Sequence, residues 1–152
     1  MKHIFLLDEN ILYHAIKGVD QHENPDTTAT EFVLLVARNC HRIWLNHELA
    51  ARYWHHLSGL TRHHAPALEP VQFMTQFMKN SAKVHEGYGD PLELPTDVKV
   101  PAEDVIIVRA ALLSNAVIVT ADNELELAVN SQPKLGVRAL KPRQAIELAK
   151  EE

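Results

Sequence analysis

Three acidic sites lie at points where predicted strands and helices meet. Asp122 ends a short β-branched apolar run that closes in the pattern Thr-x-Asp, and Asp8 ends the apolar run at residues 3–7. Glu103 and Asp104 open the helical pattern that leads into the Thr-x-Asp run. Carboxylates held at one edge of a sheet repel one another, and a hard divalent cation such as Mg²⁺ or Mn²⁺, which prefers oxygen ligands, relieves that repulsion. These residues therefore predict a metal site.

The segments around these acids must bring them to a common edge. Residues 117–121 are short and apolar on both faces, which is typical of a buried parallel strand. Helical patterns at 105–113 and 124–129 flank this strand. Such an alternation predicts a doubly wound sheet, in which ligands bind outside the carboxyl ends of the strands. We therefore expect an α/β fold with three α/β/α layers around a central, mostly parallel sheet.

The three acidic sites form sequence blocks that follow one another in a fixed order. The blocks are Leu7-Asp8-Glu9-Asn10, Glu103-Asp104 and Val119-Thr120-Ala121-Asp122. In this order, and across nearly the whole chain, they resemble the PIN domain family of Mg²⁺/Mn²⁺-dependent nucleases. The resemblance implies endonucleolytic hydrolysis of RNA phosphodiester bonds. It also implies that Asp8, Asp104 and Asp122 bind one or two metal ions, and that Thr120 orients a carboxylate or a water.

Each acid also has a purely structural alternative. Asp8 and Asp122 stand where the N-caps of the following helices are expected, and Asp is a preferred N-cap residue. The charge of Glu103 is favourable at a helix start because of the helix dipole. Asp104 lies six residues before Ala110, the spacing usual in the family, and is therefore preferred to Glu103 as the ligand.

The fourth acid of the family is the point at which this chain departs from the pattern. The family usually carries a Glu in the helix after the second strand, and alignment on Tyr53 puts Arg52 in that place. Glu48 lies one helical turn earlier on the same face, so it either reaches the metal or pairs with Arg52. The first alternative adds Glu48 to the metal-binding and catalytic set. The second predicts a catalytically degenerate PIN-like module that binds nucleic acid or protein.

The resemblance also implies partners. RNA is the expected substrate, and many small members of the family are toxins of toxin–antitoxin pairs that form homodimers and are held by an antitoxin protein. A net charge of −5 argues mildly against a dedicated nucleic-acid binder, although the acids of the metal site account for part of it. A receiver domain is a third hypothesis, since receivers are also doubly wound and carry acids at strand ends. Lys141 is the one candidate for the lysine that a receiver needs.

The whole chain has the character of one globular domain over residues 1–152. Its length suits a single core, and 46% of its residues are hydrophobic. No apolar run approaches the roughly 18 residues of a membrane helix, and the start of the chain shows no signal-peptide pattern. A single cysteine, Cys40, fits a reducing cytoplasm.

Periodicity and breaker residues place the remaining elements. Strands are predicted at 3–8, 42–45, 98–100, 117–121 and 136–140. Helices are predicted at 10–17, 28–39, 46–57, 71–83, 102–115, 123–131 and from Pro142 onward. Gly59 is expected to end the third helix, and residues 84–101 are expected to be the one long irregular stretch.

Overall fold

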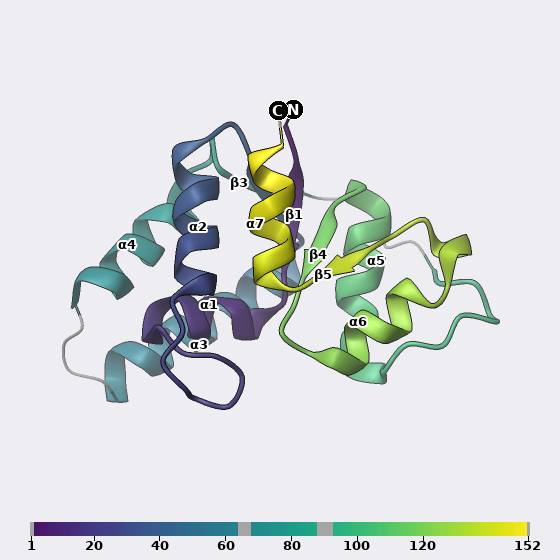
Figure 1. Cartoon of the computed structure of the whole chain (residues 1–152), viewed down its shortest axis with the longest axis horizontal. Coiled ribbons are helices and arrows are strands. Elements are labelled where there is room, and N and C mark those ends of the chain that lie inside the picture. The colour runs from purple at the N-terminus through teal and green to yellow at the C-terminus, as the bar shows by residue number, and fades with distance from the viewer. Residues whose placement is uncertain (1, 64–67, 88–92, 152) are drawn as a thin grey trace.

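A five-stranded parallel sheet forms the centre of the computed structural model, which describes residues 2–63, 68–87 and 93–151 (Figure 1). Across the sheet the strands run in the order β3 (Val84–Glu86), β2 (Arg42–Leu45), β1 (Ile4–Leu7), β4 (Val117–Val119) and β5 (Ala139–Leu140). The helices are α1 (Glu9–Lys17), α2 (Thr28–Arg38), α3 (His47–His63), α4 (Leu68–Lys79), α5 (Val105–Ser114), α6 (Asn123–Asn130) and α7 (Pro142–Lys150), with 3₁₀ turns η1 (Ala102–Asp104) and η2 (Pro133–Leu135). The predicted α/β class is confirmed.

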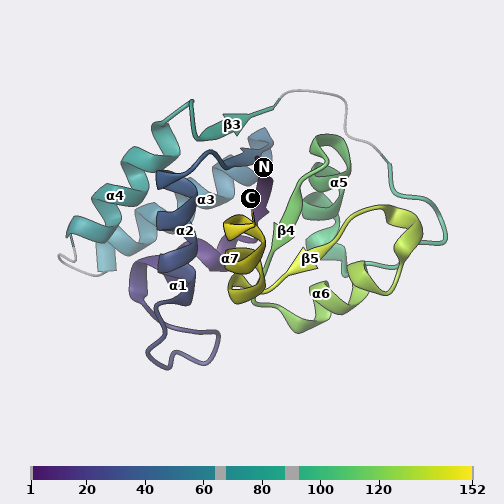
Figure 2. The same cartoon turned by 45° about the horizontal axis from the view of Figure 1, so that its top comes forward.

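Helices on both faces of the sheet give the three layers. Phe5 of β1 packs edge-on against Phe32 of α2, with ring centroids 5.0 Å apart, and α7 packs along α2. On the other face, α5 contacts β1 and β4. Figures 1 and 2 show α2 and α7 side by side, with α5 on the far side of β4. The predicted α/β/α layering is therefore confirmed.

The strand order creates a switch point between β1 and β4. The chain leaves β1 for β2 and β3, and then crosses back to place β4 on the other side of β1. Leu7 pairs with Val119, so the residues that follow, Asp8 and Thr120, emerge side by side. In open parallel sheets, ligands bind at such a switch point. Receiver domains have the strand order 2-1-3-4-5, so the receiver hypothesis is wrong.

Two predicted helix ends are confirmed by their capping bonds. The side chain of Asn46 accepts a hydrogen bond from the backbone N–H of Leu49 at 2.8 Å, which satisfies a donor at the start of α3. Gly18 ends α1 in the left-handed conformation with φ +65°, and its N–H donates to the carbonyl of His14. A side chain at position 18 would strain this backbone, which explains the glycine.

The prediction that Gly59 ends the third helix is wrong. Helix α3 continues through Gly59 to His63. A glycine inside a helix costs only about 1 kcal/mol relative to alanine, and the packing of α3 against α1 and α4 outweighs that cost. Among the described residues, no helix is both long and apolar enough to cross a membrane.

The third strand is also not where it was predicted. Residues 98–100 form no strand, because the amide of Gln132 takes the place of a partner strand: it accepts from the N–H of Lys99 at 2.9 Å and donates to its carbonyl at 2.8 Å. The strand is instead β3, a three-residue edge strand that pairs with β2. Part of the predicted irregular stretch, residues 88–92, lies outside the described residues.

Two further boundaries differ for local reasons. Helix α4 ends at Lys79 rather than at 83, because Asn80 turns the chain and accepts a hydrogen bond from the N–H of Ala82 at 3.0 Å. The last strand is confined to β5 because Gly136, with φ +67°, closes η2 in the left-handed region. One turn depends on a side-chain hydrogen bond and the other on a left-handed backbone, and the spacing of hydrophobic residues predicts neither.

Candidate functional site

Asp8 lies at the carboxyl end of β1 and is almost completely buried. Its side chain is 5% exposed and does not cap α1. Instead, the hydroxyl of Thr120 donates a hydrogen bond to Oδ2 of Asp8 at 2.8 Å. Burial raises the pKa of the Asp8 carboxyl; the hydrogen bond from Thr120 opposes this rise, and the charges of Glu9 and Asp122 add to it. The carboxylate is therefore held in one orientation at an electrostatic cost.

Thr120 connects the ends of the two central strands. It is fully buried, and its Oγ1 both donates to Asp8 and accepts from the backbone N–H of Asp122 at 3.0 Å. One hydroxyl thus fixes the Asp8 side chain and the turn that carries Asp122.

Asp122 stands at the rim of the site. Its Oδ1 accepts a hydrogen bond from the N–H of Glu124 at 2.9 Å, and it is the N-cap residue of α6. The capping alternative is therefore realised for Asp122 but not for Asp8. The second carboxylate oxygen of Asp122 takes no part in this capping bond.

Asp104 comes to the same site from η1, at the start of α5. Its side chain is 7% exposed, and its Oδ2 is buried without a hydrogen-bond partner among the described residues. Burial, followed by the charges of Asp8, Asp122, Glu103 and Glu124, raises the pKa of Asp104 to about 6. Carboxyl groups that lie far apart in the sequence are thus close enough to oppose each other's ionisation.

Glu48 lies outside this group of acids. Its side chain is 70% exposed and pairs with Arg52, with Oε1 and Nη2 3.9 Å apart. Arg52 also faces Glu9, with Nη1 and Oε2 4.0 Å apart, and donates a hydrogen bond to the carbonyl of Glu103 at 3.4 Å. The structure therefore brings together Asp8, Asp104, Thr120 and Asp122. Glu48 is turned away from them toward Arg52, which itself faces the neighbouring Glu9 and the backbone of Glu103.

Tyr53 belongs to the surroundings of the site in a way that the sequence did not reveal. Its hydroxyl is completely buried and has no hydrogen-bond partner among the described residues. Burial raises the pKa of Tyr53 well above its ordinary value, and the charges of Asp8 and Glu9 raise it further. In the sequence, Tyr53 looks like a core residue of α3, since it follows Leu49 and precedes Leu57 at helical spacing.

We expect Tyr53→Phe to raise the free energy of unfolding of the metal-free protein by about 1 kcal/mol, because it removes a buried donor that has no partner. Urea denaturation of the two proteins measures the difference. A clear loss of stability would contradict this expectation and would show that an ordered water satisfies the hydroxyl.

The donor chemistry of the site fits a hard divalent cation. Asp8 and Asp104 offer carboxylate oxygens, and the unpartnered Oδ2 of Asp104 is an acceptor in need of a positive charge. Within the described ranges, no three His, Cys, Asp or Glu side chains stand together as a group that could hold a metal ion. Mg²⁺ is commonly bound through only one or two carboxylates and keeps several waters, and the carboxylates of Asp8 and Asp104 are groups of the kind that such an ion binds.

Comparisons with known proteins find fold similarity alone. No protein-family model matches the chain, and no curated protein matches it. Among solved structures, it is similar to a PilT N-terminus domain protein from the hyperthermophilic archaeon Sulfolobus solfataricus P2. The TM-score is 0.48 at 10% sequence identity, over 98% of this chain and 95% of the other. The fold class given above rests on the strand order and packing of this chain itself.

Proposed function

We propose that this protein is a PIN-like, metal-dependent endoribonuclease whose Mg²⁺ or Mn²⁺ would be held by Asp8 and Asp104, with Asp122 at the rim. The observation that carries the proposal is the buried, unpartnered Oδ2 of Asp104 at the switch point of the sheet. A carboxylate that is raised in pKa by burial and by other carboxylates, in a place where ligands bind, is a typical functional group. When bound, such an ion supplies Lewis-acid activation of a water and neutralisation of charge on the leaving oxygen.

The residues of the chain prepare this site for an anionic substrate. Thr120 holds the Asp8 carboxylate in place, so no reorientation is needed during the reaction. Arg52 lies between Glu9 and Glu48 and offsets negative charge that would otherwise repel a phosphodiester. One carboxylate is thus fixed at the centre of the site, and Arg52 offsets part of the acidic charge beside it.

Cleavage of an RNA panel that contains single-stranded and structured molecules tests the proposal, with Mn²⁺, Mg²⁺ or EDTA added. We expect cleavage that requires the metal and that falls by on the order of 100-fold or more in Asp8→Asn, since even outer-shell residues of metal sites are commonly worth 10- to 100-fold. Glu147→Gln is the matched control, because Glu147 is an exposed acid on α7. Calorimetric titration with Mn²⁺ measures binding independently of cleavage.

A second candidate function is favoured by the Glu48–Arg52 pair. Because Glu48 pairs with Arg52 instead of joining the acids, a PIN-like module that binds nucleic acid or protein without cleaving RNA has a specific observation behind it. The absence of both cleavage and Mn²⁺ binding in the wild-type protein would count against the nuclease, would favour this alternative and would direct the search toward binding partners. A toxin role, an antitoxin partner and a homodimer stay predictions from the resemblance.

A further inference from the structure

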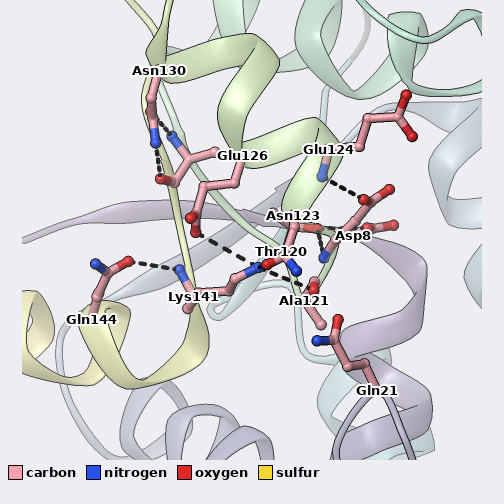
Figure 3. Close-up of polar contacts among 12 residues, drawn as sticks. Asp8, Gln21, Thr120, Ala121, Asn123, Glu124, Glu126, Asn130, Lys141 and Gln144 are labelled. Carbon is pink, nitrogen blue, oxygen red and sulfur yellow. Dashed lines mark hydrogen bonds and ion pairs between the residues drawn. The ribbon is translucent and has the colours of Figure 1, made fainter.

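A small cavity lies beside the proposed metal site, on the same edge of the sheet. Its volume is about 210 Å³. Its walls come from α1, the loop at 18–27, the start of α2, the β4–α6 turn and the start of α7. Ala121 belongs to the wall and lies between Thr120 and Asp122, and Figure 3 shows Gln21 of the loop beside Ala121. An occupant of the cavity would therefore adjoin the proposed site of cleavage.

The loop that forms one wall is held in a defined shape. The N–H of Asp26 donates to the carbonyl of Gly18, and the N–H of Asp20 donates to the carbonyl of Asn24, both at 2.9 Å. Oδ1 of Asp20 accepts from the N–H groups of His22 and Asn24 at 2.8 and 2.9 Å. The cavity is thus bounded by a fixed loop, which lowers the entropic cost of binding.

His14 is a largely buried polar residue on the wall of this cavity. It is 8% exposed, its ring lies edge-on to that of Tyr13 with centroids 6.0 Å apart, and its ring nitrogens make no hydrogen bond within the described part of the chain. Burial lowers the pKa of His14, although the charges of Asp20 and Asp26 oppose this effect. A neutral imidazole has one donor and one acceptor nitrogen, so His14 can satisfy both a donor and an acceptor on one ligand.

The charged groups of the cavity exclude simple ions. Asp20 and Asp26 line it together with Lys141 and Arg143. Hydrogen bonds lower the pKa of both aspartates, so they are ionised acceptors at neutral pH. The two carboxylates would repel a phosphate or sulfate, and the lysine and arginine would repel a metal cation. The matching ligand is neutral, with donors on one edge and acceptors on another.

Lys141 is already engaged, and it ties the cavity to the proposed metal site. Its Nζ donates to the carbonyl of Ala121 at 3.1 Å and lies 3.9 Å from Oε2 of Glu126 (Figure 3). Arg143 is exposed, and among the described residues its Nη2 donates one long bond, of 3.4 Å, to the hydroxyl of Thr28. Arg143 is therefore the cation that can turn toward a ligand.

We propose that this cavity binds one nucleobase of the RNA strand next to the cleaved phosphodiester, and that it selects bases with an exocyclic amino group over uracil. The inference rests on the proposed function, and it adds to that function a preference for certain bases in the RNA. A nucleobase is neutral and flat, with donors and acceptors along its edges, and single-stranded RNA is typically read through such splayed-out bases. The amino group suits the two aspartates, and ring or carbonyl acceptors suit His14 and Arg143. The cavity is smaller than the ~300–1,000 Å³ of drug-sized sites, so it holds a single base.

Binding of the four uncharged nucleosides guanosine, adenosine, cytidine and uridine in EDTA tests the inference without any metal or cleavage. Calorimetry or NMR titration is expected to show that guanosine, adenosine and cytidine bind at least about threefold more tightly than uridine, as one hydrogen bond allows. Arg143→Gln and Gln21→Ala, both on the exposed wall, are expected to weaken binding by roughly 3- to 10-fold. His14→Leu is expected to do the same. Glu147→Gln, which lies away from the cavity, should leave binding unchanged.

The outcomes separate this inference from the nuclease. Preferential binding of guanosine, adenosine and cytidine that persists in Asp8→Asn, and that weakens in Arg143→Gln, supports the base site whether or not RNA is cleaved. Equal affinity for all four nucleosides, or affinity that none of the three wall variants changes, overturns the base site even if metal-dependent cleavage is found. Because Arg143 and Gln21 are surface residues, failure of His14→Leu to fold leaves two variants that decide the matter.

Discussion

Asp104→Asn is expected to abolish metal-dependent cleavage and, in the same protein without metal, to raise the stability of the fold. Asparagine keeps the size of the side chain but removes a buried charge that opposes Asp8 and Asp122. It also removes a carboxylate that the metal would need. Loss of activity with a gain in stability is the signature of a group that is retained for function at a cost to folding.

The size and pH dependence of the stability gain follow from the raised pKa. In the unfolded chain the Asp104 carboxyl ionises near 3.8, and in the folded protein its pKa is about 6. Below the first value both states are protonated and the wild-type protein bears no penalty. Between the two values the unfolded state loses its proton first, so the wild-type protein loses stability as the pH rises, and above about 6 the loss is complete. The full shift corresponds to about 3 kcal/mol, which solvent screening at the open edge of the sheet reduces to about 1–2 kcal/mol.

Urea denaturation in EDTA at several pH values between 4 and 8 measures this difference. We expect the two proteins to be equally stable near pH 4 and the variant to be the more stable one above pH 6. Glu103→Gln is the matched control, since it removes the neighbouring charge and should change stability and cleavage much less. Equal effects of the two substitutions on stability and cleavage would show that Asp104 contributes no more to the site than Glu103 does.

Thr120→Val is expected to lower both stability and activity, although it conserves the shape of the side chain. The hydroxyl is fully buried, donates to Asp8 and accepts from the N–H of Asp122. Its loss removes the hydrogen bond to the buried Asp8 carboxyl and the bond from the half-buried N–H of Asp122, at a cost of about 1–3 kcal/mol for such a defect. The pKa of Asp8 should rise further, because the hydrogen bond from Thr120 is what opposes its rise. Cleavage should fall by on the order of 10- to 100-fold, as for other partners of metal ligands.

Thr120→Ser is the control that separates the hydroxyl from the packing of the methyl group. It should keep most of the cleavage activity, because the serine hydroxyl can make both hydrogen bonds. Denaturation and cleavage assays on the two variants give the comparison. If valine and serine behaved alike, the hydroxyl would have no part in orienting Asp8.

Local sequence determined the elements that carry the site. The runs that end at Asp8 and Asp122 are apolar because both faces of β1 and β4 are covered, and this pattern is visible without any knowledge of the fold. Caps such as Gly18 and Asn46 are equally local, since each acts within four residues of its own position. Alternation of these elements was enough to predict a parallel α/β sheet and the edge at which the acids lie.

Contacts between distant residues were decided only by the tertiary structure. Strand β3 owes its place to pairing with β2, and residues 98–100 are kept out of the sheet by Gln132, more than thirty residues away. Whether Glu48 joins the acids or pairs with Arg52 depends on how α3 packs against α1 and η1, and the spacing of residues in the sequence does not determine that packing. The burial that raises the pKa of Asp104, and the cavity around His14, likewise arise where separate segments meet. Periodicity specifies which face of an element is buried, but the packing of elements specifies what each buried polar group meets.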